Sequence, residues 1–165
     1  MTEVIQADST HFSTIRNIAL QTWPPTFGDI LSGAQIEYML EMMYSIPALQ
    51  EQVNQKGHTF ILVSEEEAFL GFASYELNYQ GQPKTKIHKI YVLPAAHGKG
   101  LGKVLIDHIR EVALAHCNPT LTLNVNRYNR AVQFYERIGF TMVGKEDISI
   151  GNGYLMEDYI MEKTL

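Results

Sequence analysis

KIHKIYVLPAAHGKGLG, residues 86–102, joins a predicted strand to a predicted helix through a turn that holds three alternating glycines. Glycine at positions 98, 100 and 102 lets the backbone approach a ligand closely and turn N–H groups toward it. The first turn of the following helix adds unpaired N–H donors and the positive end of a helix dipole. We therefore expect this loop to bind an anion such as a phosphate group.

Two familiar phosphate-binding motifs do not fit the loop. A dinucleotide fingerprint requires glycine at position 103, where the chain has Lys103. A P-loop requires glycine at 97 and Ser or Thr at 104, where the chain has His97 and Val104. The plain alternative is a tight strand–helix turn without a ligand.

Outward from this stretch, hydrophobic periodicity and turn residues predict the order β-α-α-α-β-β-β-α-β-α-β-β. Asp8 or Ser9 is expected to cap the first helix, and Pro24-Pro25 to end it. The order indicates an α+β fold with one mixed, mostly antiparallel sheet of about seven strands flanked by helices, in a single domain over residues 1–165. The expected elements are a strand at Val4–Ala7, helices after Asp8, Gly33 and Ser45, strands at Thr59–Ser64, Ala68–Asn78 and Lys86–Val92, a helix at Leu101–His116, a strand at Thr120–Asn126, a helix at Asn129–Ile138, and strands at Met142–Ile150 and Leu155–Glu162.

The net charge of −5 is distributed unevenly along the 165 residues. Residues 1–70 hold nine acidic and two basic side chains, whereas residues 71–165 hold nine acidic and eleven basic ones. Five lysines and no acid lie between residues 84 and 103. This division suits an anionic ligand in the second half of the chain and a cationic ligand facing the first half, although ordinary solvated faces also explain it.

A second motif lies downstream of the glycine loop. NRYNRAVQFYERIGF, residues 126–140, resembles the signature of the GNAT superfamily of N-acetyltransferases, in which an Asn precedes Ala, Phe-Tyr and Gly-Phe. Tyr91-Val92 followed by the three glycines resembles the coenzyme motif of the same superfamily, with His97 where Gln or Arg is usual. Together the two motifs cover about a third of the chain, residues 86–140.

The resemblance implies a GNAT fold and acetyl-CoA as the acetyl donor, with no metal. It implies that the pantetheine arm lies between two splayed strands, paired with backbone near Tyr91 and Val92. Asn129 would hold the arm or the phosphate region, and Tyr135 would point at the thioester sulfur. The residues that would bind the pyrophosphate are His97, Gly98, Lys99, Gly100, Leu101, Gly102 and Lys103.

Acetyl transfer to an amine needs a proton acceptor for the amine, a donor to the tetrahedral oxyanion and an acid for the departing thiolate. The Val92 amide is the candidate oxyanion donor, and Tyr135 is the candidate acid. The candidate base is His88, because it has the same strand parity as Val92, so both are expected to point to one face, and an imidazole can accept a proton near neutrality, directly or through water. A half-buried structural role for His88, and a core role for Tyr135, remain the alternatives.

The outer parts of the chain are similar to bacterial spermine/spermidine N-acetyltransferases, through QTWPPTF at 21–27 and DYIMEKTL at 158–165. This resemblance implies direct transfer to a primary amine, a polyamine such as spermidine, in a ternary complex. Asp29, Glu37 and Glu41 would attract the polycation, and Trp23 and Phe27 would hold its alkyl stem or make cation–π contacts. The alternatives are acceptors on a protein N-terminus, a lysine or an antibiotic, or a non-catalytic acetyl-CoA sensor.

Several classes are not expected. No apolar run approaches the ~20 residues of a membrane helix, and the start of the chain does not read as a signal peptide, so a cytoplasmic location is expected. The lone Cys117 cannot form an intrachain disulfide, and the histidines show no metal-ligand spacing. An isoelectric point near 5.6 argues against a nucleic-acid partner. GNAT proteins are often dimers, so the resemblance favours a homodimer.

Overall fold

The computed structural model describes residues 1–165 and contains seven strands and five α-helices in the predicted order. The strands are β1 (Thr2–Gln6), β2 (Thr59–Glu65), β3 (Ala68–Glu76), β4 (Lys84–Val92), β5 (Thr120–Asn126), β6 (Thr141–Ser149) and β7 (Leu155–Thr164). The helices are α1 (Phe12–Phe27), α2 (Gly33–Tyr44), α3 (Ile46–Asn54), α4 (Leu101–Ala115) and α5 (Ala131–Arg137). None of the helices is long and apolar enough to span a membrane.

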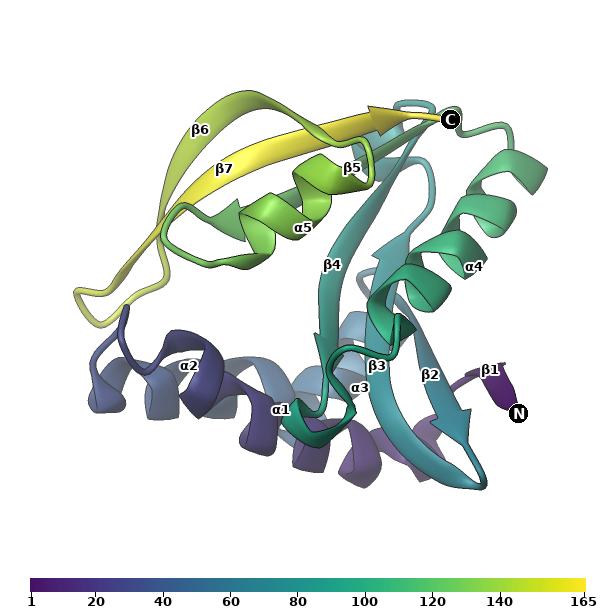
Figure 1. Ribbon diagram of the computed structural model, residues 1–165. Coiled ribbons are helices and arrows are strands. Elements are labelled where there is room, and N and C mark those ends of the chain that lie inside the picture. The colour runs from purple at the N-terminus through teal and green to yellow at the C-terminus, as the bar shows by residue number, and fades with distance from the viewer.

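One mixed sheet runs through the molecule in the order β1-β2-β3-β4-β5-β7-β6, which confirms the predicted fold class. All neighbouring strands are antiparallel except β4 and β5. These two pair only from Lys84 and Thr120 to Ile87 and Leu123, and beyond this point they diverge (Figure 1). The divergence opens a gap beside the end of β4, between the β1–β4 part of the sheet and the wing formed by β5, β7 and β6.

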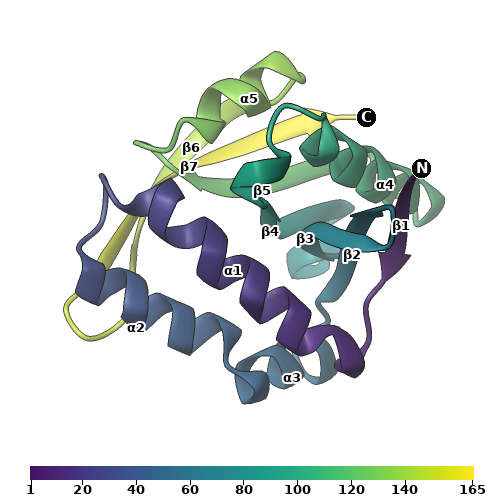
Figure 2. The same cartoon turned by 60° about the horizontal axis from the view of Figure 1, so that its bottom comes forward.

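Two hydrophobic clusters hold the layers together, one on each face of the sheet. One cluster packs α4 and Tyr135 of α5 against residues such as Ile61, Ile87 and Leu123. The other packs α1, α2 and α3 against residues such as Leu62 and Phe72 (Figure 2). The two layers together frame the gap between β4 and β5.

Helix α1 does not end at Pro24-Pro25, as the sequence predicts, but continues to Phe27. Proline removes a backbone donor, yet its fixed φ is compatible with a helix, and the buried side chains Trp23 and Phe27 hold this segment against the core. The N–H of Gly28 then donates to the carbonyl of Pro24 at 2.8 Å. The additional turn carries Phe27 and Asp29 to the edge of the gap.

A β-bulge interrupts the pairing of β3 with β4. Ser74 faces Lys89 and Tyr75 faces Ile87, so His88 is the extra residue and has no partner on β3. A bulge breaks the alternation of side chains along a strand. The prediction that His88 shares a face with Val92 is therefore wrong: Val92 packs with the α4 cluster, whereas His88 stacks on His58 on the α3 side.

Candidate active site

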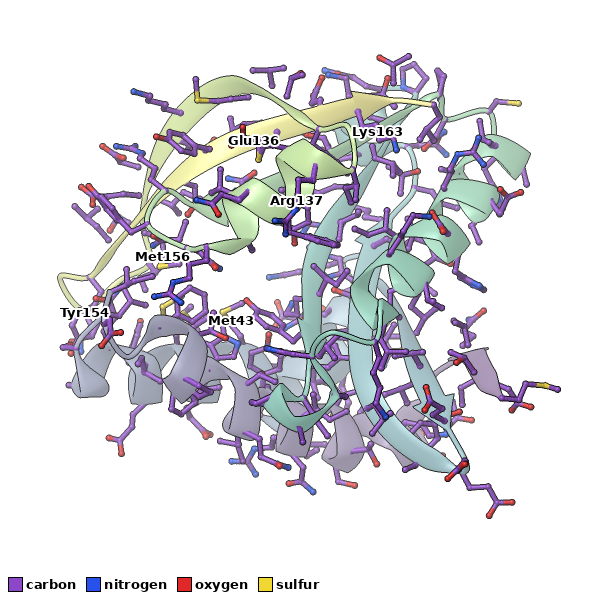
Figure 3. The ribbon with its side chains drawn as sticks, in the orientation of Figure 1. Met43, Glu136, Arg137, Tyr154, Met156 and Lys163 are labelled. Carbon is purple, nitrogen blue, oxygen red and sulfur yellow. The ribbon has the colours of Figure 1, made fainter.

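A cleft of about 1370 Å³ occupies the gap between β4 and the β5–β7 wing. The glycine loop and α5 form one end of it, and α1, α2 and the β6–β7 loop form the other. Met43 of α2 and Met156 of β7 approach it from opposite sides (Figure 3). The predicted residues that line it are Trp23, Phe27, Asp29, His88, Tyr91, Val92, His97, Gly98, Gly100, Leu101, Gly102, Asn129 and Tyr135.

The glycine loop has the geometry of an anion site. Gly98 and Gly100 adopt positive φ angles of +85° and +75°, and a Cβ added at either would meet only open space. Helical hydrogen bonding begins at Val104, whose N–H donates to the Gly100 carbonyl at 3.1 Å. The six amides from residue 98 to residue 103 donate to no backbone carbonyl, which leaves them available for a ligand. A pyrophosphate group fits this set of donors.

The basic side chains of the loop are already engaged within the protein. The Nε2 atom of His97 lies 2.8 Å from the Val92 carbonyl oxygen and so ties the loop to the end of β4. Lys99 pairs with Glu65 at 3.4 Å and Lys103 with Asp107 at 2.7 Å, and neither side chain lines the cleft. Anion binding at these two positions therefore depends on their amides rather than on their ammonium groups.

Helix α5 presents Tyr135 to the cleft. Its ring packs against Phe134 and Phe140, and its hydroxyl makes no hydrogen bond within the protein. Burial raises the pKa of Tyr135 well above its ordinary value, so the phenol keeps its proton. Asn129 stands before this helix and accepts a hydrogen bond from the Ala131 N–H at 2.9 Å, which fixes the start of α5.

His88 belongs to a cluster that sequence spacing did not reveal. Its Nε2 atom lies 2.9 Å from Glu76 Oε1, and its ring stacks on His58 with centroids 3.9 Å apart. Burial lowers the pKa of His88 to about 2, and the nearby His58 and Lys89 act in the same direction. The imidazole is therefore neutral at physiological pH and does not titrate in its ordinary range.

The cluster of His58, Glu76 and His88 has the donor types of a metal site, and its ligand atoms lie within 4.8 Å of one another. The electrostatic surroundings oppose a divalent cation, because the positive charges of Lys56, Lys86 and Lys89 act on these histidines. Lys89 is itself buried and donates to Gln52 Oε1 at 2.7 Å. Burial lowers the pKa of Lys89 to about 7.

Only some of the residues predicted to bind the acceptor amine lie at the acceptor end of the cleft. Trp23, Phe27 and Asp29 line it, but Glu37 and Glu41 do not. Both glutamates are exposed on α2, where Glu41 pairs with Arg16 at 3.4 Å. The prediction that they face the acceptor is therefore wrong, because α2 buries its Ile36, Met39 and Leu40 face and turns the glutamates to solvent.

Sequence reasoning missed Asp158, Asn124 and Asn126, which lie on the cleft side of the wing. The register pairs Asn126 of β5 with Asp158 of β7, so the two side chains share a face. The sequence signal was weak, because Asp158 is one of three acidic residues in the final strand, with Glu157 and Glu162, and such residues usually face solvent.

The β6–β7 loop closes the acceptor end against α2. The Tyr38 hydroxyl donates to the Ile150 carbonyl at 2.9 Å, and Gln35 Nε2 donates to the Leu155 carbonyl at 2.9 Å. The ring of Tyr154 packs on Tyr38, with centroids 5.4 Å apart (Figure 3). These contacts join segments far apart in the sequence and define the end wall of the cleft.

Comparisons with known proteins agree with this geometry. The acetyltransferase (GNAT) domain family matches residues 29–163. The chain is similar to the 5-NmdU N-acetyltransferase of Pseudomonas phage PaMx11, with 34% identity over 125 residues that cover 74% of this chain and 85% of that protein. It is also similar to the peptidyl-lysine N-acetyltransferase YjaB of Escherichia coli (strain K12), with 31% identity over 97 residues that cover 58% of each chain.

A solved structure extends the likeness to the whole fold. The PaiA N-acetyltransferase from Thermoplasma acidophilum, solved in complex with coenzyme A, superposes with a TM-score of 0.82 at 23% identity and covers 100% of this chain and 99% of its own. The splayed strands, the loop of free amides and the family match together identify the donor and the reaction class. The chain belongs to the GNAT acetyltransferase family and is an N-acetyltransferase that takes its acetyl group from acetyl-CoA.

Proposed function

We propose that the acceptor is the primary amine of a cationic alkylamine, a polyamine such as spermidine, and that the acetyl group passes to it directly in a ternary complex. The observation that carries this proposal is the separation of charge along the cleft. Arg130 and Arg137 line it at the two ends of α5, whereas Asp29 after α1 and Asp158 of β7 line it on the side of α1, α2 and the wing. Lys89 also lines the cleft, but it is buried and donates to Gln52. An anionic donor and a cationic acceptor suit this arrangement.

The walls of the acceptor end favour an alkyl stem between charged groups. Met39, Met43, Met156 and Ile148 line it together with Phe27. Methionine side chains adapt to irregular apolar ligands, and methylene groups gain free energy by leaving water. A polyamine combines such methylene segments with separated ammonium groups.

In the proposed reaction, the amine nitrogen attacks the thioester carbonyl carbon and the carbon–sulfur bond breaks. The amine releases one proton to a base, and the thiolate gains one proton from an acid, which recovers it from water. The Val92 amide is proposed to donate to the oxyanion, since β4 has no strand partner on the β5 side beyond Ile87. Tyr135 is proposed to donate a proton to the thiolate, through a phenol that burial keeps protonated.

His88 is proposed as the proton acceptor, acting as a neutral imidazole. Glu76 contacts its Nε2 atom at 2.9 Å and would fix the ring so that Nδ1 is the free acceptor. The low pKa of His88 makes it a weaker base than an ordinary imidazole, so it would pass the proton of the amine on to water, from which Tyr135 recovers the proton that it gives to the thiolate. The alternatives are that His88 has a structural role and that Glu76 of the preceding strand, or water in the cleft, accepts the proton.

The test is a panel of acceptors, with free-thiol release from acetyl-CoA as the rate and product mass as the identity check. We expect the highest kcat/KM for spermidine, ahead of a lysine-containing peptide, a peptide with a free N-terminus and streptothricin. Higher salt should raise the KM for spermidine, because screening weakens the attraction of the acidic end. Asp29→Asn should raise it as well, whereas Glu111→Gln on the exposed face of α4 should not.

Two results would contradict the proposal. One is a preference for a peptide or for the antibiotic over spermidine. The other is acetyl-CoA binding without thiol release on any amine, which would indicate a sensor rather than an enzyme for polyamines.

A further inference from the structure

Asp158 is a carboxylate for which the fold supplies almost no partner. The residue is 6% exposed, its Oδ1 atom is shielded from solvent and has no hydrogen bond, and its Oδ2 atom accepts one long bond of 3.4 Å from Asn124. Burying an unsatisfied carboxylate destabilises a protein. Asp158 also lines the cleft, so a cationic group in the cleft can compensate the carboxylate charge that the protein leaves unpaired.

The basic residues around Asp158 are occupied elsewhere. Lys86 of β4 hydrogen-bonds to the Tyr79 hydroxyl at 3.3 Å and lies over its ring. Arg127, which follows β5, pairs with Asp147 and reaches only the backbone carbonyl of Asp158. Neither side chain forms a salt bridge with the Asp158 carboxylate.

A second carboxylate lies beside Asp158 on the same face of the wing. The β6–β7 register places Glu146 opposite Asp158, and Glu146 is exposed where Asp158 is buried. The row from Asn126 through Asp158 to Glu146 thus becomes more acidic from β5 toward the edge strand β6. Carboxylates arranged in this way favour a ligand that carries a positive charge at a distance from the amine that reacts.

We propose that Asp158 binds a second, non-reacting ammonium group of the acceptor and so selects diamines and polyamines over monoamines. This inference rests on the proposed function and adds the residue that sets its specificity. A carboxylate stabilises the charged form of the amine it holds, so it is suited to the nitrogen that stays protonated rather than to the one that attacks. Met43 and Met156 line the same end and would contact the methylene chain between the two nitrogens.

The kinetic test compares putrescine with n-butylamine, which have the same chain length and differ in one ammonium group. The wild type should favour putrescine in kcat/KM. Asp158→Asn should lower kcat/KM for putrescine by roughly 30-fold or more and leave that for n-butylamine nearly unchanged. Glu157→Gln, one position away on the opposite face of β7, should behave like the wild type. A purely structural role would instead lower both rates together, and an unchanged ratio in Asp158→Asn would overturn the inference.

A stability measurement supplies a second, independent test. Burial raises the pKa of Asp158 above 3.8, with Glu146 acting in the same sense and Asn124, Lys86 and Arg127 against it. Ionisation therefore destabilises the folded state, and the cost grows as the pH rises from about this value through the raised pKa. In the absence of acceptor, Asp158→Asn should therefore have a higher melting temperature than the wild type at pH ~7. The difference in melting temperature should be smaller at pH ~4. A lower melting temperature than the wild type at neutral pH would overturn the inference.

The two proposals fail in different ways. If the wild type acetylates neither spermidine nor these two amines, the proposed function fails, and calorimetry of putrescine with the coenzyme A complex decides the inference. Tighter binding to the wild type than to Asp158→Asn would support it, and equal binding would overturn it.

Discussion

Replacing Gly100 by valine tests the coenzyme loop. The residue has a φ of +75° and faces open space within the cleft, so the new side chain would stand where the pyrophosphate must approach the amides of residues 98–103. Each amide bond to a charged phosphate contributes ~1.5–3 kcal/mol. Displacing the phosphate from a single amide should therefore weaken acetyl-CoA binding by ~10- to 10²-fold, as measured by calorimetry.

The left-handed backbone at this position requires a matched control. Valine there is strained by at least ~1–2 kcal/mol whatever the ligand, so the melting temperature will fall. Gly81 has a φ of +72° and equally open surroundings but lies outside the cleft, so Gly81→Val carries the same strain. We expect both variants to lose stability and only Gly100→Val to lose affinity. Equal affinity in the two variants would refute the assignment of the loop.

Two further predictions concern the proposed chemistry. Tyr135→Phe removes one hydroxyl and keeps the ring, so kcat should fall ~10²-fold or more while acetyl-CoA affinity stays the same; a wild-type kcat would mean that water or another group protonates the thiolate. His88→Ala should lower kcat by ~10²-fold without moving the pH–rate profile, because a group with a pKa of about 2 is already neutral above the acid range. The opposite outcome is a wild-type rate that rises between pH ~6 and 8 and a His88→Ala variant in which this rise disappears. His88 would then titrate as an ordinary imidazole, and burial would not lower its pKa.

Local sequence patterns predicted the fold well. The glycine loop between a strand and an amphipathic helix lies where residues 86–102 indicated, and the order of strands and helices follows the predicted one. Elements of this kind depend on short-range periodicity, caps and turn residues, which a single sequence displays. Ser32 and Ser45, for example, cap α2 and α3 by accepting from Gln35 and Ala48.

The acceptor end was harder to predict, because it depends on contacts between distant segments. The bulge that reorients His88 arises from pairing with β3, which strand alternation within β4 alone does not reveal. The orientation of Glu37 and Glu41 depends on which face of α2 packs inward. Asp158 is buried and lines the cleft, and this placement depends on the pairing of β7 with β5 and β6, which the sequence of β7 alone does not reveal.

The central claim is that one cleft binds the donor at its amide-rich end and a cationic amine at its acidic end. Calorimetry with a bisubstrate conjugate, spermidine joined to the sulfur of coenzyme A through an acetyl bridge, tests it most directly. The conjugate should bind at least ~10-fold more tightly than coenzyme A, a gain of ~1.4 kcal/mol. Gly100→Val should weaken the binding of both ligands. Asp158→Asn should remove only the affinity that the conjugate gains over coenzyme A. A conjugate that binds no more tightly than coenzyme A itself would contradict the account.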